Sequence, residues 1–193
     1  EDRESNDYIY AVANLASMRS ERLNRKKRLA QQFEKANSGA RFEVVDLANP
    51  WIQDHVKLLF KIWEERKASE DRNAEYAVQV DHERLAIERV CDTASFHKLL
   101  VGAVFIEEHV CGFTIDEILP NQYCMGHYWK ADTAHRGTYD FLVQRMARHL
   151  ETEGVAFWNW QQDLGIEGLR RAKLSLEPES FLRKYTVSLN EGL

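Results

Sequence analysis

Two apolar, β-branched runs lie next to each other in the middle of the chain, and they constrain its fold more than any other feature. The first run spans residues 99–107 and the second spans residues 110–119, with only Glu108 and His109 between them. Two such runs joined by a short polar connection are typical of a β-hairpin. The chain is therefore expected to contain a β-sheet that includes this hairpin.

Further elements are predicted before the hairpin. Residues 23–33 have the pattern of a basic helix, and residues 42–47 alternate as a strand does. Residues 51–63 carry apolar side chains at helical spacing after a proline, which predicts a second helix. The charged stretch 64–75 is interpreted as a loop, and residues 80–91 as a third helix.

After the hairpin, alternation predicts a strand over residues 123–129 that places Tyr123, Met125, His127 and Trp129 on one face. Glycine, proline and apolar spacing divide the rest of the chain. The remaining elements are expected as a turn at residues 132–137, a helix to residue 151, a strand at 155–160, a short helix at 165–174 and a last strand at 184–189.

This order resembles that of the GNAT acyltransferase fold. The expected fold class is α/β (α+β), with a GNAT-like mixed sheet flanked by helices on both faces. Because βαβ crossovers are right-handed, the strands that begin at Tyr123 and Val155 should be parallel neighbours that splay apart, with the turn at Gly137 at their mouth. Residues 1–40 are interpreted as a connecting segment with a basic helix, and residues 41–193 as the GNAT-like domain.

Charge is unevenly distributed along the chain. The whole chain has a formal net charge of −5, whereas residues 19–35 carry seven bases against Glu21 and Glu34, a net charge of +5. The bases of this segment are Arg19, Arg22, Arg25, Lys26, Lys27, Arg28 and Lys35. Contact with a polyanion is therefore expected to be local to this segment, and a solvated helix face is the alternative.

The apolar runs and the cysteines indicate where in the cell such a chain is expected. The longest apolar run, residues 99–106, is far shorter than the roughly 20 residues that a membrane-spanning helix needs. No secretory signal is visible, and Cys91, Cys111 and Cys124 lie too far apart for a Cys-x-x-Cys pair. The sequence predicts reduced structural thiols, no metal site, no transmembrane segment and a cytoplasmic location, with peripheral membrane association left open.

The turn before the helix that ends at residue 151 is the first candidate site. Backbone N–H groups at a helix start bind phosphates, so Arg136, Gly137 and Thr138 are candidate substrate-binding residues. Acyl-CoA-dependent members of the fold carry Arg/Gln-x-x-Gly-x-Gly/Ala here, but Ala134 and Tyr139 break that pattern. Tyr139 would crowd a pyrophosphate, so acyl-CoA is the less favoured donor, and a simple helix start is the alternative.

The second candidate site is a polar run directly after the strand at residues 155–160. Asn159 and Asp163 offer acceptors at a strand end, which is where open α/β sheets bind ligands. Arg170 and Lys173 are three residues apart on one predicted helix face and suit an anion or a carboxylate. Glu167 belongs to the same group. In the alternative interpretation, Asp163 caps a helix, Asn159 stabilises a turn and the bases are solvated.

The run from Asp163 to Ser175 resembles the signature Asp-Leu-Gly-Ile-x-Gly-Leu-Arg-x-x-Lys of the phosphatidylglycerol lysyltransferase C-terminal domain family. The similarity covers almost the whole chain, through residues 8–10, 27–28, Phe33, 111–115, 130–132 and 136–137. Such proteins usually contain two GNAT-like halves, and this chain resembles the connecting segment and the second half. Where relatives tend to carry Asn-Arg-Glu-x-Asp, this chain has Asn-Trp-Gln-Gln-Asp at residues 159–163 and so loses an arginine and a carboxylate.

The resemblance implies a bacterial aminoacyltransferase that moves an aminoacyl group from aminoacyl-tRNA to a hydroxyl or amine. Asp163 and Lys173 are its candidate catalytic residues. His127 joins them as a candidate general base, because histidine titrates near neutrality, and a structural role on its strand is the alternative. The basic segment would bind tRNA, and a lipid head group or a small molecule would be the acceptor. A first GNAT-like half is a further expected partner, and no cofactor is predicted with certainty.

Two alternatives remain open. One is an acyl-CoA-dependent N-acyltransferase, which the incomplete turn at Gly137 disfavours. The other is a non-catalytic GNAT-like binding module, which Trp160 and Gln162 in the signature favour.

Overall fold

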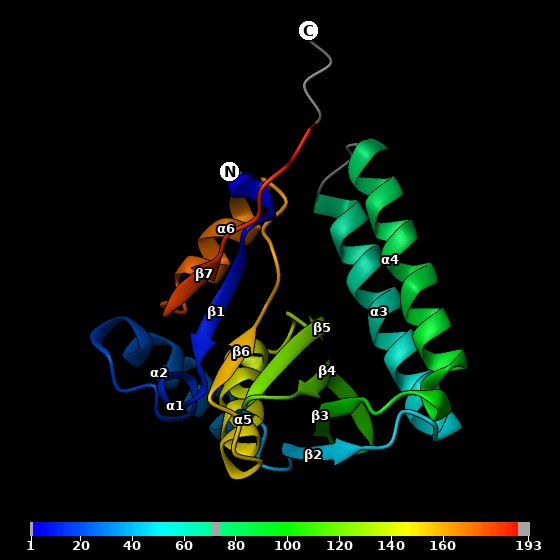
Figure 1. Ribbon diagram of the computed structural model, residues 1–193. Coiled ribbons are helices and arrows are strands. Elements are labelled where there is room, and N and C mark those ends of the chain that lie inside the picture. Colours follow the sequence, from blue (N-terminus) through cyan, green and yellow to red (C-terminus); the bar gives the residue numbers. More distant parts are fainter. Residues whose placement is uncertain (1, 71–73, 189–193) are drawn as a thin grey trace, which may run out of the picture.

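The computed structural model describes residues 2–70 and 74–188, and the side chains of residues 67–79 are outside that description. Within these residues the strands form one seven-stranded mixed sheet of order β2-β3-β4-β5-β6-β1-β7 (Figure 1). Its strands are β1 (Asp7–Ala11), β2 (Arg41–Val45), β3 (Leu100–Ile106), β4 (His109–Leu119), β5 (Tyr123–Ala131), β6 (Phe157–Asn159) and β7 (Ser180–Leu182). The predicted hairpin is the β3–β4 pair, in which Val101 pairs with Ile115.

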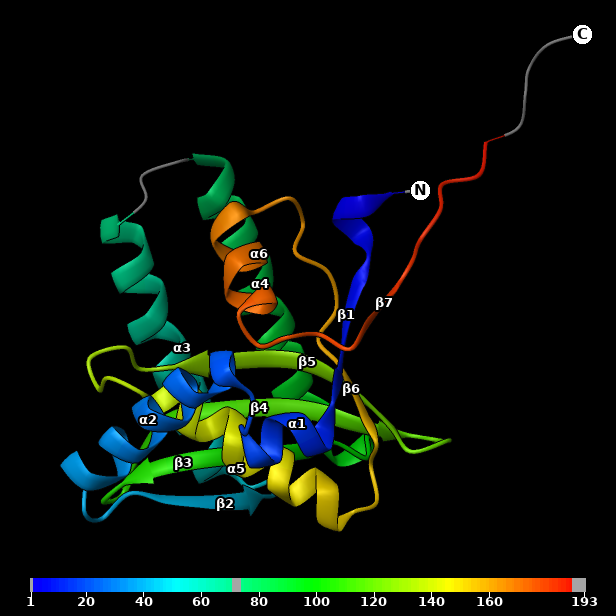
Figure 2. The same ribbon diagram turned by 90° about the vertical axis from the view of Figure 1, so that its left-hand side faces the viewer.

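Helices cover both faces of the sheet, as expected. On one face α5 (Thr138–Thr152) packs against β3, β4 and β5, with α1 (Val12–Ser17) and α2 (Glu21–Ala36) packed on α5. On the other face α3 (Pro50–Glu70) packs against β4 and β5 and against α4 (Ala74–Asp92). Figure 2 shows the first group on the near side of the sheet and α3 and α4 rising behind it. Helix α6 (Glu167–Leu174) precedes β7.

The N-terminal strand β1 lies inside the sheet between β6 and β7 and runs antiparallel to both. Ile9 pairs with Asn159 on one side and with Ser180 on the other. The start of the chain thus contributes an inner strand beside the polar run that follows β6. A domain boundary at residue 40 stays a prediction, and residues 7–11 share their sheet with residues 41–182.

Strands β5 and β6 are parallel neighbours, which confirms the predicted pairing. Their pairs run from Tyr123 opposite Phe157 to Met125 opposite Asn159, and the ladder goes no further. The polar run therefore begins where the two strands separate.

The predicted common face of Tyr123, Met125, His127 and Trp129 is wrong. Asp116 pairs with Gly126, whereas the adjacent Ile115 pairs with Tyr128, so His127 is an extra residue on β5. Such a β-bulge inverts the alternation of side chains beyond it. As a result Trp129 packs in the same core as Cys124, and Tyr128 faces the core on the α3 side.

Two other predicted elements are also wrong. The charged stretch 64–75 is not a loop up to residue 70, because α3 continues to Glu70 and α4 begins at Ala74; residues 71–73 lie outside the description. Glu, Lys, Arg and Ala are good helix formers, so charge alone does not indicate a loop.

The last strand is Ser180–Leu182, and residues 183–188 form no strand, because Lys184 N donates to the Asn6 side chain at 2.8 Å instead of continuing a ladder. Leu189 lies outside the description.

Within the described residues, no helix combines the length and the apolar character needed to span a bilayer. The three cysteines are free and buried, and burial raises the pKa of the Cys111 thiol to about 12. Thiols with raised pKa values are poor nucleophiles, which agrees with their predicted structural role.

Candidate functional site

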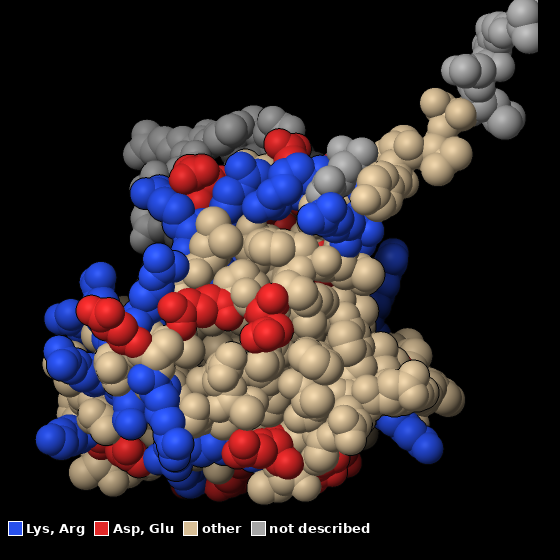
Figure 3. Space-filling view, turned by 60° about the vertical axis from the view of Figure 1, so that its left-hand side comes forward, with Lys and Arg blue, Asp and Glu red and all other residues tan. Residues whose placement is uncertain are grey.

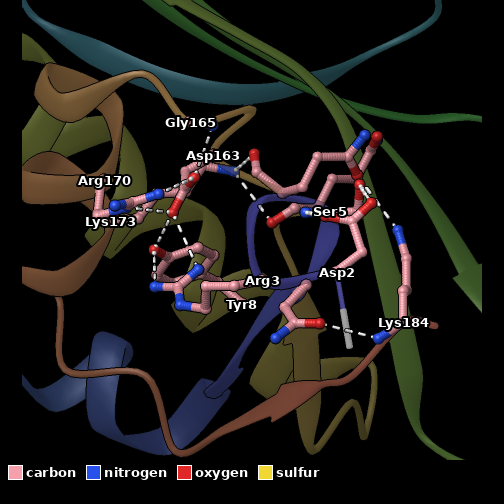
Figure 4. A network of polar contacts seen from close by, with 12 residues as sticks. Asp2, Arg3, Ser5, Tyr8, Asp163, Gly165, Arg170, Lys173 and Lys184 are labelled. Carbon is pink, nitrogen blue, oxygen red and sulfur yellow. Dashed lines mark hydrogen bonds and ion pairs between the residues drawn. The ribbon is translucent and has the colours of Figure 1, made fainter. Parts of the chain in front are cut away.

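Asp163 is the centre of a polar network at the loop between β6 and α6 (Figure 4). Its carboxylate is fully buried and accepts a hydrogen bond from the Tyr8 hydroxyl at 2.5 Å. Arg170 on α6 donates to both carboxylate oxygens, at 3.0 and 3.2 Å, and Gly165 N donates at 2.9 Å. Arg3 donates at 3.3 Å. The Asp163 carboxylate therefore joins the polar run to residues from the first turn and strand of the chain.

The donors around Asp163 keep it ionised. Burial by itself raises the pKa of this carboxyl group, but hydrogen bonds from Arg170, Tyr8 and Gly165 outweigh burial and lower the pKa well below its usual value. The Asp163 main chain also accepts a bond from Ile166 N, and its side chain bonds Gly165 N two residues on. Asp163 thus shapes the turn before α6 and at the same time presents a stable negative charge.

Lys173 lies on the same helix and is buried, with 8% of its surface exposed. Its Nζ donates to three successive main-chain carbonyls, those of Trp160, Gln161 (3.1 Å) and Gln162 (2.9 Å). An ammonium has three donors, so these bonds use all of them. Burial lowers the pKa of Lys173 to about 8. The geometry makes Lys173 the residue that holds the loop, near Asp163 through the shared neighbour Tyr8.

Asn159, at the end of β6, also stabilises the loop between β6 and α6. It is fully buried, its amide donates to Asp7 at 3.0 Å, and its carbonyl oxygen accepts from Gln161 N at 2.7 Å. Lys184 completes this layer by donating to Asp7 at 2.6 Å and to Gln162 at 3.3 Å. Glu167, in contrast, is exposed and pairs with Arg171 at 3.5 Å.

The turn at Gly137 is covered rather than open. Gly137 has a φ of +90°, and a Cβ there would lie 2.3 Å from the Leu29 carbonyl oxygen, so α2 packs directly on it. Two N–H groups of the turn have acceptors: Ala134 N bonds the Asp132 carboxylate at 2.8 Å, and Thr138 N bonds the His135 carbonyl at 3.2 Å. The packing of α2 argues against a pyrophosphate at Gly137, because the Leu29 carbonyl occupies the space beside the backbone that the phosphates would need.

Two substrate-binding candidates of that turn and the predicted base lie apart from the Asp163 network. Thr138 is buried and its hydroxyl donates to the His135 carbonyl at 2.6 Å, whereas Arg136 is exposed. His127 lies on the bulge of β5, where its Nε2 is 3.3 Å from a carboxylate oxygen of Glu117 on β4. The structure brings Asp163, Arg170, Lys173 and Asn159 together, and it places His127 beside an acid on the neighbouring strand.

Sequence reasoning missed a second buried acid, Asp116 on β4. Its side chain is fully buried; Oδ1 accepts from Trp158 Nε1 at 2.8 Å, and Oδ2 has no hydrogen-bond partner among the described residues. Burial raises the pKa of Asp116 to about 7, although polar groups of Thr114, Trp158 and Trp129 oppose that rise. The available signal was an aspartate inside an apolar β-branched run.

The basic segment forms one wall of a groove of about 720 Å³. Arg22, Arg25 and Lys26 of α2 line it on one side, and Leu174 and Ser175 at the end of α6 line it on the other. Figure 3 shows Lys and Arg side chains gathered at the left of this face, where α2 lies, with a few acidic groups among them. Lys26 also pairs with Asp140 on α5 at 3.4 Å. The groove therefore joins the basic helix to the helix that follows the Asp163 loop.

Several solved structures share this fold. A conserved protein of unknown function from Bacteroides thetaiotaomicron aligns with a TM-score of 0.80 and 24% identity, over 93% of this chain and 58% of that chain. L-PGS from Bacillus licheniformis aligns with a TM-score of 0.63 and 13% identity over 92% and 58%. The C-terminal domain of a putative lysylphosphatidylglycerol synthetase from Agrobacterium fabrum aligns with a TM-score of 0.60 and 14% identity over 92% and 57%.

These identities are low enough that the structures show the fold alone, and the chain spans a little under three fifths of the length of these solved chains. No curated protein is similar enough in sequence to match. The sequence model of the phosphatidylglycerol lysyltransferase C-terminal family matches residues 1–188, which include β1, the basic helix and the whole Asp163 network. This protein therefore belongs to the phosphatidylglycerol lysyltransferase C-terminal family.

Proposed function

We propose that this chain is an aminoacyltransferase domain that takes its acyl group from aminoacyl-tRNA and passes it to a hydroxyl or amine. Membership of the family supports an acyltransferase-like domain. The observation that carries the choice of donor is the groove between α2 and α6, where Arg22, Arg25 and Lys26 lie across from Leu174 and Ser175 at the end of the helix that carries Arg170. A basic helix at the edge of an acidic protein suits the phosphates of a tRNA.

The proposed chemistry needs little from the protein beyond alignment. The acceptor oxygen or nitrogen attacks the ester carbonyl of the aminoacyl group, the bond from that carbonyl carbon to the ribose oxygen breaks, and the acceptor proton passes to the ribose oxygen. Because the ester is already activated, holding the two reactants in register supplies much of the acceleration. Asp163 is proposed to attract the positive charge of the aminoacyl group, and Arg170 to stabilise the developing oxyanion.

Lys173 is assigned a different part from the one that its place in the signature suggests. All three of its N–H donors bond the carbonyls of residues 160–162, so it positions the loop instead of contacting the reacting ester. His127 is proposed as a general base only for an acceptor that approaches the bulge of β5.

A non-catalytic binding module is the second candidate, and one observation favours it. Trp160, which stands where relatives tend to carry an arginine, packs against Tyr10, Trp129 and Trp158 as part of the core. An aromatic cluster there adds stability and offers no charge to a substrate.

Retention of tRNA on immobilised protein tests the proposed donor, with two matched double variants of α2. Arg22→Gln with Arg25→Gln removes two exposed bases from the groove, whereas Arg28→Gln with Lys35→Gln removes two exposed bases of the same helix that do not line it. The first variant should weaken retention. It should also reduce the slope of the logarithm of the binding constant against the logarithm of salt concentration by the amount expected for about two lost phosphate contacts. The second should change both much less.

Equal retention by the two variants and the parent would contradict the proposal and favour the binding module. A transfer assay with aminoacyl-tRNA and a panel of hydroxyl and amine acceptors then separates catalysis from binding. Both variants lie on exposed positions, so their melting temperatures should match that of the parent.

A further inference from the structure

Arg3 occupies a small site that is built like a receptor for a cation. Its guanidinium donates to the Asp163 carboxylate at 3.3 Å and to the Tyr8 hydroxyl at 3.2 Å. The same group lies over two aromatic rings, 5.8 Å from the centre of Tyr8 and 5.5 Å from the centre of Phe181. A carboxylate, a phenol oxygen and two ring faces together are the groups that bind ammonium and guanidinium ions in proteins.

Contacts other than those with Arg3 also position the three receptor groups. Asp163 keeps its paired bonds from Arg170 and its bonds from Tyr8 and Gly165, and both Asp163 and Tyr8 are fully buried. Phe181 lies edge-on to Tyr8, with ring centres 5.0 Å apart, and is 38% exposed. The site therefore has a rigid buried floor and one wall that reaches the protein surface.

The Arg3 side chain is the loosely held member of this group. It is 45% exposed, and its two hydrogen bonds are single and longer than the Tyr8 bond to Asp163. Its backbone lies in the short turn Arg3–Ser5, which Asp2 and Ser5 close through a side-chain bond of 2.7 Å, and Leu164 N donates to the Glu4 carbonyl at 3.2 Å. The guanidinium can therefore swing into solvent while the turn keeps its place.

We propose that Asp163, Tyr8 and Phe181 form a cation subsite, and that Arg3 fills it as an internal mimic which a positively charged ligand displaces. The ligand class is an alkyl guanidinium or alkyl ammonium group. Its identification as the charged group of an aminoacyl substrate rests on the proposed function, whereas the subsite itself does not. Displacement exposes the Asp163 carboxylate to a ligand without leaving it unpaired, because Arg170 stays bound to it.

The test uses n-butylguanidine as the probe and n-butylurea as its neutral counterpart of the same shape. Binding to the parent, to Arg3→Ala and to Arg89→Ala is measured by calorimetry; Arg89 is an exposed arginine on α4, far from the subsite in sequence. Arg3→Ala should bind n-butylguanidine at least tenfold more tightly than the parent. Arg89→Ala should match the parent, and n-butylurea should bind none of the three.

Adding Phe181→Ala to Arg3→Ala should remove most of the gain, since one ring face is lost. If Arg3→Ala does not fold, Arg3→Gln takes its place in the binding experiment. Recovery of Arg3→Ala folding by n-butylguanidine, but not by n-butylurea, also supports the subsite. Unchanged affinity in Arg3→Ala, an equal gain in Arg89→Ala, equal binding of the urea, or no recovery of an unfolded variant would overturn the proposal.

These outcomes are independent of the tRNA experiment. Loss of tRNA retention concerns the bases of α2, whereas n-butylguanidine is a cation, which those bases repel. A subsite that binds the probe in a protein that ignores tRNA would keep this inference and reject the donor, and the reverse result would do the opposite.

Discussion

Asp163 and Asp116 are the same residue type and both are fully buried, but the pKa values of their carboxyl groups are shifted in opposite directions. Asp163 receives hydrogen bonds from Tyr8, Arg170 and Gly165, and the pKa of its carboxyl group is lowered. Asp116 has one bond from Trp158 at 2.8 Å and a second oxygen without a partner among the described residues, and burial raises its pKa to about 7.

The difference teaches that burial does not decide the charge of an acid in this protein. Removal from water raises the free energy of both ionised carboxylates. At the loop after β6, two arginines, a phenol and a backbone N–H offset that cost for Asp163, whereas Asp116 has no comparable set of donors. The loop is therefore a place of fixed charge, which suits recognition of a charged ligand. At the centre of β4, burial favours the protonated form of Asp116.

The largest expected effect is on the pH dependence of stability at Asp116. The folded state keeps the Asp116 proton up to a pKa of about 7, whereas the unfolded chain releases it near 3.8, so stability falls as pH rises between those values. The group should contribute about 4 kcal/mol to that fall in the free energy of unfolding. Urea unfolding of the parent and of Asp116→Asn between pH 4 and 7 measures it.

Asp116→Asn should flatten the profile, while Asp54→Asn, at an exposed position on α3, should leave its slope intact. Parallel profiles for the parent and Asp116→Asn would show that Asp116 is ionised when folded and would remove the contrast with Asp163.

The next effect in size is expected at Asp163. Asp163→Asn should lower the free energy of unfolding at pH 7 by about 3 kcal/mol, because it leaves Arg3 and Arg170 without their carboxylate; both reach solvent, which places the loss at the low end for a buried pair. The lowered pKa means that the parent loses this stability only as pH falls below about 4. Urea unfolding at pH 7 and pH 3 should show the two proteins converging in acid.

An equal gap between the two proteins at both pH values would mean that the lost stability comes from the turn and not from the charge of Asp163. In that case the loop would resemble an ordinary helix start.

The smallest effect is expected at Glu167, an exposed acid at the start of α6. Its pairing with Arg171 at 3.5 Å is open to water, so Glu167→Gln should change the free energy of unfolding by less than about 0.5 kcal/mol. The same urea experiment at pH 7 measures it. A loss comparable to that of Asp163→Asn would show that Glu167 takes part in the network.

Much of the fold and part of the site follow from local patterns. The hairpin of β3 and β4, the helix α2 and the parallel pairing of β5 with β6 were all predicted, because period and composition are local properties of the chain. The polar run after β6 was located for the same reason. His127 shows the limit: a bulge opposite Asp116 is invisible to an alternation rule that assumes an uninterrupted ladder.

The partners of the predicted site residues were not predictable in the same way. Asp163 meets Arg3 and Tyr8 across 160 and 155 residues of sequence, and Asn159 meets Asp7 across 152. The sequence predicted a phosphate-binding turn at Gly137, but the docking of α2 packs the Leu29 carbonyl against that glycine. Each of these contacts depends on how separate elements dock.

By itself the sequence determined most of the helices and strands, where the positive charge is concentrated and where the polar run lies, since neighbours along the chain control these properties. Only the tertiary structure decided that β1 enters the sheet between β6 and β7. That insertion brings Arg3 and Tyr8 to Asp163 and gives the buried carboxylate its charge. The physical reason is that an ionisable group responds to every donor within a few ångströms, and those donors are set by packing and not by distance along the chain.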